Sequence, residues 1–215
     1  QGAGGTTIDS HHHVLIGYAA GGTGDIANNG ATAVGYQALT ALTSGERNLA
    51  IGFQAADTLT QGDDNVAIGH SALGGATTTD GIDKNVAIGN GAMSGTNAGA
   101  AQNVAVGYAA LDGNLTSAAD NNTAVGHYAG SAITSGASNT SIGSNSGYTL
   151  STGIRNTFIG NSAGYATVDV DNSVFIGYNA GSGADITAAA DGTIGIGVSS
   201  LAALTSGEAN IAIGY

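Results

Sequence analysis

Aromatic rings recur in this chain at one fixed place, directly after a glycine that follows Ile or Val. Side chains of this kind can stack on the rings of a glycan, and they can also stack on one another where a repeated unit brings them together. The residues at this place are Tyr18, Tyr36, Phe53, His70, Tyr108, His127, Tyr178 and Tyr215. Both roles stay open, a glycan-binding stripe and a packing ladder at a subunit interface. Because a repeat sets the position, the sequence favours the packing ladder.

Histidine and aspartate are the candidates for metal chemistry. His11, His12 and His13 are consecutive, and a histidine tract can bind a transition metal, either within one chain or with one imidazole from each of three chains on an axis. The sequence favours the simpler interpretation, in which these histidines lie at a surface or a corner. Three pairs of aspartates could bind calcium, but they better suit solvated turns; the pairs are Asp63 and Asp64, Asp80 and Asp83, and Asp169 and Asp171. We therefore expect no metal site and no cofactor, and His11 and His13 are the candidates should a metal bind.

Motifs for catalysis are missing from the sequence. It contains no nucleophile elbow, no paired histidines around a glutamate and no phosphate-binding loop. Paired carboxylates in turns do not make a glycosidase without a cleft to hold the substrate between them. We therefore expect that this chain is not an enzyme.

The glycines that precede the rings mark a repeat that runs through the whole chain. They are separated by 17 to 20 residues, and they are Gly17, Gly35, Gly52, Gly69, Gly89, Gly107, Gly126, Gly143, Gly160, Gly177, Gly197 and Gly214. A period of this length is typical of stacked units in which each unit contacts only its neighbours. The sequence predicts an all-β fold, a parallel β-solenoid or β-roll of about twelve coils of 17–20 residues. We expect residues 1–215 to form one continuous domain that is a segment of a longer fibre.

Positions within a repeat are counted here from its glycine, which is position 0. Position −1 is Ile or Val in every repeat, position −2 is mostly Ala, and position −3 is Val, Thr, Leu or Ile. This alternation is typical of a short strand. We expect positions −3 and −1 to face the core, and the small residues at −2 and 0 to pack against sister chains around a threefold axis. For the glycine a second role stays open, a corner with positive φ.

Asparagine marks the entry to most of these strands, at position −4. The residues are Asn48, Asn65, Asn85, Asn103, Asn122, Asn139, Asn156 and Asn210. Asparagine tolerates left-handed backbone, so it suits a corner. In stacked coils the side-chain amides could also hydrogen-bond to one another along the rod.

Charge excludes several classes of partner. The net charge is −12, with only three Lys and Arg residues among 215. Binding to nucleic acid requires many cationic contacts with phosphates, so neither nucleic acid nor an anionic membrane surface is an expected partner. No apolar run approaches the roughly 20 residues that a membrane-spanning helix needs, so we expect no membrane insertion. The chain lacks cysteine, which leaves the redox compartment undefined.

The strand motifs resemble those of two related groups of proteins. Asn65-Val66-Ala67-Ile68-Gly69 and Asn103-Val104-Ala105-Val106-Gly107 resemble the head repeats of YadA-like trimeric autotransporter adhesins. The longer run from Asn156-Thr157-Phe158-Ile159-Gly160 to Tyr165 is similar to repeats in bacteriophage tail fibres. The resemblance covers nearly the whole chain, and it implies a left-handed parallel β-roll, a homotrimer, and a place outside the cell or on a virion.

The expected function is therefore structural. We expect a shaft segment of a phage tail fibre, or of a similar surface appendage, that supports attachment to a host surface and its glycans. Neither a membrane anchor nor a coiled-coil stalk is found in this sequence, which favours the fibre. The alternatives are a bacterial trimeric surface adhesin that binds glycan or matrix and, as a minor one, an ice-binding solenoid.

Overall fold

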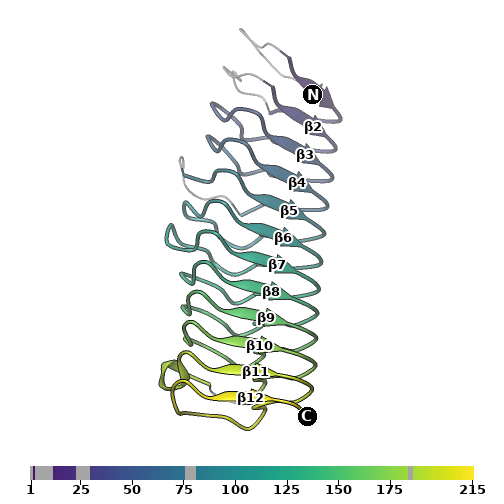
Figure 1. The fold of residues 1–215 in the computed structure, drawn as a ribbon. Coiled ribbons are helices and arrows are strands. Elements are labelled where there is room, and N and C mark those ends of the chain that lie inside the picture. Colours follow the sequence, from purple (N-terminus) through teal and green to yellow (C-terminus); the bar gives the residue numbers. More distant parts are fainter. Residues whose placement is uncertain (1, 3–11, 23–29, 76–80, 184–185) are drawn as a thin grey trace.

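The structure is a computed structural model that describes residues 2, 12–22, 30–75, 81–183 and 186–215. It is a rod of stacked coils, and each coil contributes one three-residue strand to a single parallel sheet of twelve strands in chain order (Figure 1). The strands are β1 Val14–Ile16, β2 Thr32–Val34, β3 Leu49–Ile51, β4 Val66–Ile68, β5 Val86–Ile88, β6 Val104–Val106, β7 Thr123–Val125, β8 Thr140–Ile142, β9 Thr157–Ile159, β10 Val174–Ile176, β11 Ile194–Ile196 and β12 Ile211–Ile213. The prediction of an all-β parallel solenoid is confirmed.

The sheet keeps one register from end to end. In β4 and β5, for example, Val66 lies beside Val86 and Ile68 beside Ile88. Each position of the repeat therefore pairs with the same position in the next coil, and every position forms a column along the rod. The extra residues of longer repeats lie in the connections between strands, and a 3-10 turn, Ala188–Ala190, is part of one of them.

The inward face of the sheet is the opposite of the predicted one. The alanines at position −2, such as Ala33, Ala87 and Ala105, are fully buried, whereas the Ile and Val side chains at −3 and −1 are half-buried or exposed. The coil is narrow, so a small side chain on the strand wall leaves room for a larger one across from it. In several coils the larger residue lies four residues after the glycine, as Leu39, Leu73, Met93 and Leu111 do, and further large buried side chains, such as Leu59 and Ile133, lie seven residues after it.

In two coils the large buried side chain lies on the strand wall instead. Phe158 and Phe175 replace alanine at position −2, and their buried rings stack with centroids 5.5 Å apart. Position +4 of the same coils is glycine. A Cβ on Gly164 would lie 2.8 Å from Phe158 Cδ1, and a Cβ on Gly181 would lie 2.5 Å from Phe175 Cγ. In these two coils a large residue on the strand wall thus takes the place of a large residue on the opposite wall.

The glycine at position 0 serves the contact between coils. Its φ lies between +128° and +140° in all twelve repeats, a region that other residues rarely adopt. From Gly17 to Gly197, an added Cβ would lie 2.0–2.5 Å from the carbonyl oxygen of the next glycine in the column. The predicted Ala and Gly face for sister chains is therefore wrong, because the alanines face the core and the glycines face the next coil.

Candidate functional site

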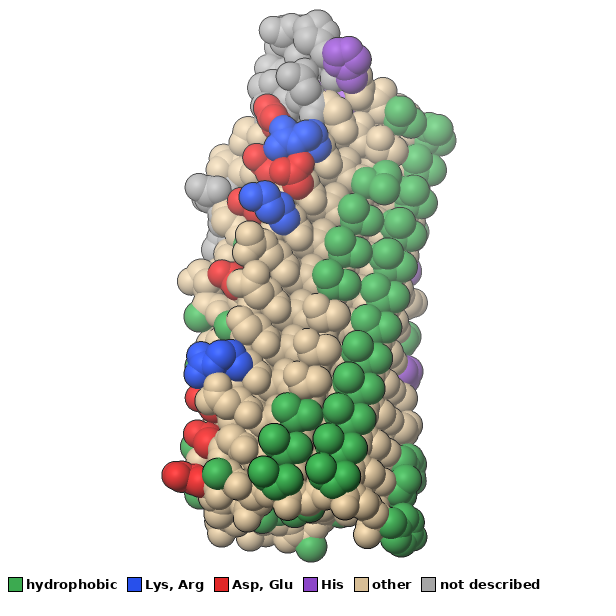
Figure 2. All heavy atoms as spheres, viewed as in Figure 1, with side chains coloured by type: hydrophobic (Ala, Val, Ile, Leu, Met, Phe, Trp, Pro, Cys, Tyr) green, Lys and Arg blue, Asp and Glu red, His purple; other side chains and the backbone are tan. Residues whose placement is uncertain are grey.

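The outer face of the sheet carries a continuous column of Ile and Val side chains at position −1. Beside it runs a column at position −3 that is aliphatic except for Thr32, Thr123, Thr140 and Thr157. Figure 2 shows these columns running along the rod, with the charged side chains gathered on the other side of the same view. Ile16 is 59% exposed and Ile142 is 38% exposed. With about 4.8 Å between strands, the twelve-stranded face is about 53 Å long. The three-residue strands make it about 10 Å wide, and the ring column at +1 lies beside it, past the end of each strand.

The rings at position +1 form stacked runs at the border of this face. Tyr18, Tyr36, Phe53 and His70 stack in succession, with centroids 4.9–5.3 Å apart and planes within 12° of parallel. Tyr108 and His127 form a second run, with centroids 5.3 Å apart. Inside each run the ring faces cover one another, so mainly the ring edges meet solvent. A sugar ring could stack only where a run ends or is interrupted.

A further group of rings lies outside the predicted stripe. Tyr128 packs edge-to-face against Tyr108, His127 and Tyr148, with centroids 4.4–6.0 Å apart, and Tyr148 stacks on Tyr165 at 5.1 Å. The neighbouring Tyr108 side chain is the main reason that the pKa of Tyr128 is raised. The sequence prediction considered rings at position +1 only, whereas these tyrosines lie at +2 and +5. The presence of tyrosine at +5 in two successive coils would have indicated a second stack.

The asparagines form a hydrogen-bonded column inside the rod. The Asn65 amide donates to Asn48 Oδ1 at 3.1 Å, and the Asn65 backbone N–H donates to the same oxygen at 3.0 Å. The same pattern links Asn85 to Asn65 and Asn156 to Asn139. After Asn156 the column continues through Ser173 and Thr193. Asn210, the last of the eight, donates to Gly207 O in its own coil.

The left-handed corner precedes the asparagine and is not formed by it. Position −5 has positive φ, for example 55° at Arg47, 57° at Asp64 and 58° at Lys84. The asparagines themselves are the first residues of the buried strand wall. The predicted corner role of asparagine is therefore wrong by one residue.

His13 occupies the asparagine slot of the first coil. Its Nδ1 accepts the backbone N–H of Ala31 at 3.1 Å, as the asparagine oxygens do in later coils. His11 lies outside the described residues, as does Asp80 among the candidate calcium ligands. Within residues 12–22, 30–75, 81–183 and 186–215, no group of three or more His, Asp or Glu side chains could hold a metal ion.

The aspartates examined as calcium ligands make contacts within the rod. Asp63 accepts the backbone N–H of Glu46 at 2.7 Å, and Asp83 accepts the N–H of Asp63 at 2.8 Å. Arg47 Nε donates to Asp64 at 2.6 Å, and this hydrogen bond is the main cause of the lowered pKa of Asp64. These carboxylates therefore link neighbouring coils.

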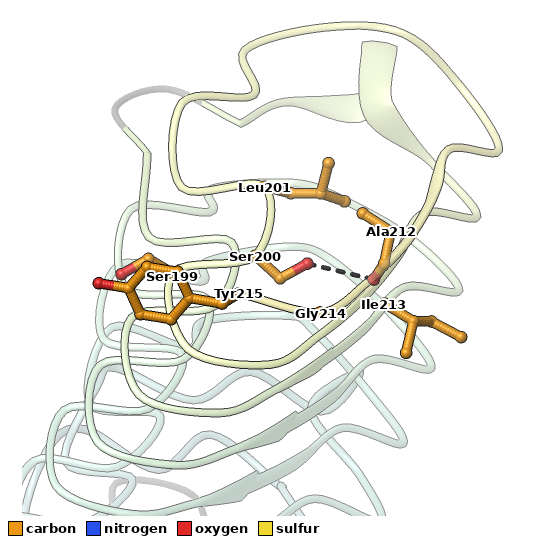
Figure 3. Close-up of a pocket in the computed structure, with 7 residues that line it drawn as sticks. All are labelled: Ser199, Ser200, Leu201, Ala212, Ile213, Gly214 and Tyr215. Carbon is orange, nitrogen blue, oxygen red and sulfur yellow. Dashed lines mark hydrogen bonds between the residues drawn. The ribbon is translucent and has the colours of Figure 1, made fainter.

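A shallow hollow lies at the last coil (Figure 3). It is lined by Ser199, Ser200, Leu201 and the run from Ala212 to Tyr215. The Ser200 hydroxyl donates to Ala212 O at 3.1 Å. The lining offers hydroxyls and apolar groups but no acid or base within it, so it carries no argument for catalysis.

Comparison with known proteins does not assign this chain to a family. No protein family, no curated protein and no solved structure matches this chain. Among the described residues, no helix is long and apolar enough to cross a membrane. The resemblance to adhesin heads and tail fibres therefore rests on the strand motifs alone.

Proposed function

We propose that this chain is a segment of a homotrimeric fibre, the shaft of a bacteriophage tail fibre or of a similar extracellular appendage, that supports attachment to a host surface. The observation that carries the proposal is the aliphatic outer face of the sheet. A face about 53 Å by 10 Å covers roughly 500 Å², the size of the largest apolar patch on a typical monomer, and such patches are often functional. It is about two thirds of the roughly 800 Å² that each partner buries in a standard interface.

The repeat itself argues that the partner is a second copy of this chain. The aliphatic columns have the spacing of the strands from β1 to β12. A partner that packs along the whole face must carry side chains at that same spacing, and a parallel copy of the chain does so. The charged residues lie away from the aliphatic columns (Figure 2). Three rods with their aliphatic faces turned to a common axis would keep these charges in water.

Sedimentation equilibrium tests the assembly directly. The chain has a mass of 20.6 kDa, so we expect a species of three times that mass that persists on dilution. Ile142→Asp places a charge on the aliphatic face and should dissociate the assembly, because a buried unpaired charge costs several kcal/mol.

The matched control lies in the same coil. Ser138 is exposed at the left-handed corner with φ 59°, a conformation that Asp tolerates. Ser138→Asp should leave the mass unchanged. A wild-type protein that sediments as a monomer at every concentration would overturn the proposal.

A further inference from the structure

The column of rings at position +1 is interrupted at Asn90. His70 ends the first stacked run and Tyr108 begins the second. The registers of β4 with β5 and of β5 with β6 place Asn90 in the coil between them, at the same position. Among the described residues, no ring stacks on the faces of His70 and Tyr108 that are turned toward Asn90. One rung of the ladder is therefore missing.

The gap between the rings of His70 and Tyr108 is wide enough for one further ring. Successive rings in the first run lie 4.9–5.3 Å apart. Two coils of about 4.8 Å each put the faces of His70 and Tyr108 about 10 Å apart. A ring that enters midway would lie about 5 Å from each face, the spacing that the ladder already uses. The C–H bonds of a pyranose are attracted to the electron-rich faces of aromatic rings on both sides.

Asn90 supplies polar groups at the same place. It is exposed, and its backbone carbonyl accepts the N–H of Ala109 at 3.0 Å. Among the described residues, its carboxamide makes no hydrogen bond, so two N–H donors and one oxygen acceptor remain for a ligand. Sugar hydroxyls need both kinds of partner. A net charge of −12 disfavours an anionic sugar.

We propose that His70, Asn90 and Tyr108 form a binding site for a neutral saccharide, with one sugar ring between the two aromatic faces and its hydroxyls on the Asn90 carboxamide. The site would provide the surface contact that the proposed attachment role requires. It does not depend on how many chains assemble.

The column is also interrupted over two coils, at Ser144 and Asn161, and over one coil at Val198. The interruption at Val198 provides a comparison, because it also spans a single coil. Val198 lies between Tyr178 and Tyr215 at the same position of the repeat. The rings on either side of Val198 are also two coils apart, but the valine side chain has no group that can form a hydrogen bond. Asn90→Val therefore turns the proposed site into the apolar version that the chain already contains, and it should weaken binding.

Histidine-ring NMR tests the site, since the chain has only five histidines. Titration with maltotetraose, cellotetraose and N-acetylchitotetraose should shift the His70 ring protons for at least one of the three sugars. Tyr108→Ala should weaken that binding at least about tenfold, because stacking on one face is lost. Tyr18→Ala removes a ring at the far end of the first run and should leave binding unchanged.

The decisive variant is Asn90→Tyr, which inserts the missing rung. It should raise the melting temperature by joining the two runs and should abolish sugar binding. The proposal is wrong if none of the three sugars shifts His70, or if Asn90→Tyr still binds. It is also wrong if Asn90→Tyr changes the sedimentation mass while the wild type binds no sugar, because the gap then accepts a sister chain. The mass of the wild-type protein tests the fibre proposal separately.

Discussion

Phe158 and Phe175 occupy an inward position where most coils carry alanine, and each has a glycine at position +4 of its own coil. In these two coils the exchange is visible in the sequence, because Phe at −2 coincides with Gly at +4. The coincidence indicates that position −2 faces inward. The alternation of β-branched residues instead predicted that Ile and Val at −3 and −1 form the core, because alternation separates the two faces of a strand without showing which one is enclosed.

Ser141 gives a test at the scale of one side chain. It is buried between Ala124 and Phe158 in the sheet, and its Oγ has no hydrogen-bond partner. Ser141→Ala should raise the free energy of unfolding by about 1 kcal/mol, because an unpaired buried hydroxyl is removed. Urea denaturation measures the change.

The matched control is Ser146→Ala in the same coil. Ser146 is also buried, but its Oγ donates to Gly143 O at 3.1 Å. This variant should lose about 1 kcal/mol. If the two variants change stability in the same direction, the assignment of the unpaired hydroxyl is wrong.

At the scale of the coil, the strand, the glycine and the asparagine column act together. The sequence was sufficient for the strands, since the period and the alternation of residues place all twelve. It was not sufficient for the corner, because position −5 has positive φ with residues as different as Arg47, Lys84, Asn121 and Gly192. Gly and Asn favour such backbone but Arg and Lys do not, so no single residue type marks the position.

Gly107 tests the contact between coils. Its φ is +139°, and a Cβ would lie 2.4 Å from Gly126 O. Gly107→Val should cost at least about 4 kcal/mol, because the strained backbone and the clash with a backbone atom occur together. Thermal unfolding followed by circular dichroism measures the loss.

Asp112→Asn is the control in the turn of the same coil. Burial raises the pKa of the Asp112 carboxyl, so a neutral amide is tolerated there, and the change should stay within about 0.5 kcal/mol. Equal melting temperatures for the two variants would contradict the role given to the glycine column.

At the scale of the whole molecule, the rod has two unlike sides. The aliphatic columns follow the outer face of the sheet, and the charged side chains lie apart from them in the same view (Figure 2). The sequence predicted an array and a partner chain but placed the partner on the wrong face. That error has a physical cause, since both faces of these strands are apolar and alternation alone cannot say which is enclosed.

Inter-chain distances measured by electron spin resonance test the central claim most directly. The chain has no cysteine, so Ile142→Cys and Ser138→Cys each carry one spin label per chain, on the aliphatic face and at the charged corner. If three rods meet through their aliphatic faces, labels at 142 should be closer to one another than labels at 138. No coupling between chains, or shorter distances at 138 than at 142, would contradict the account.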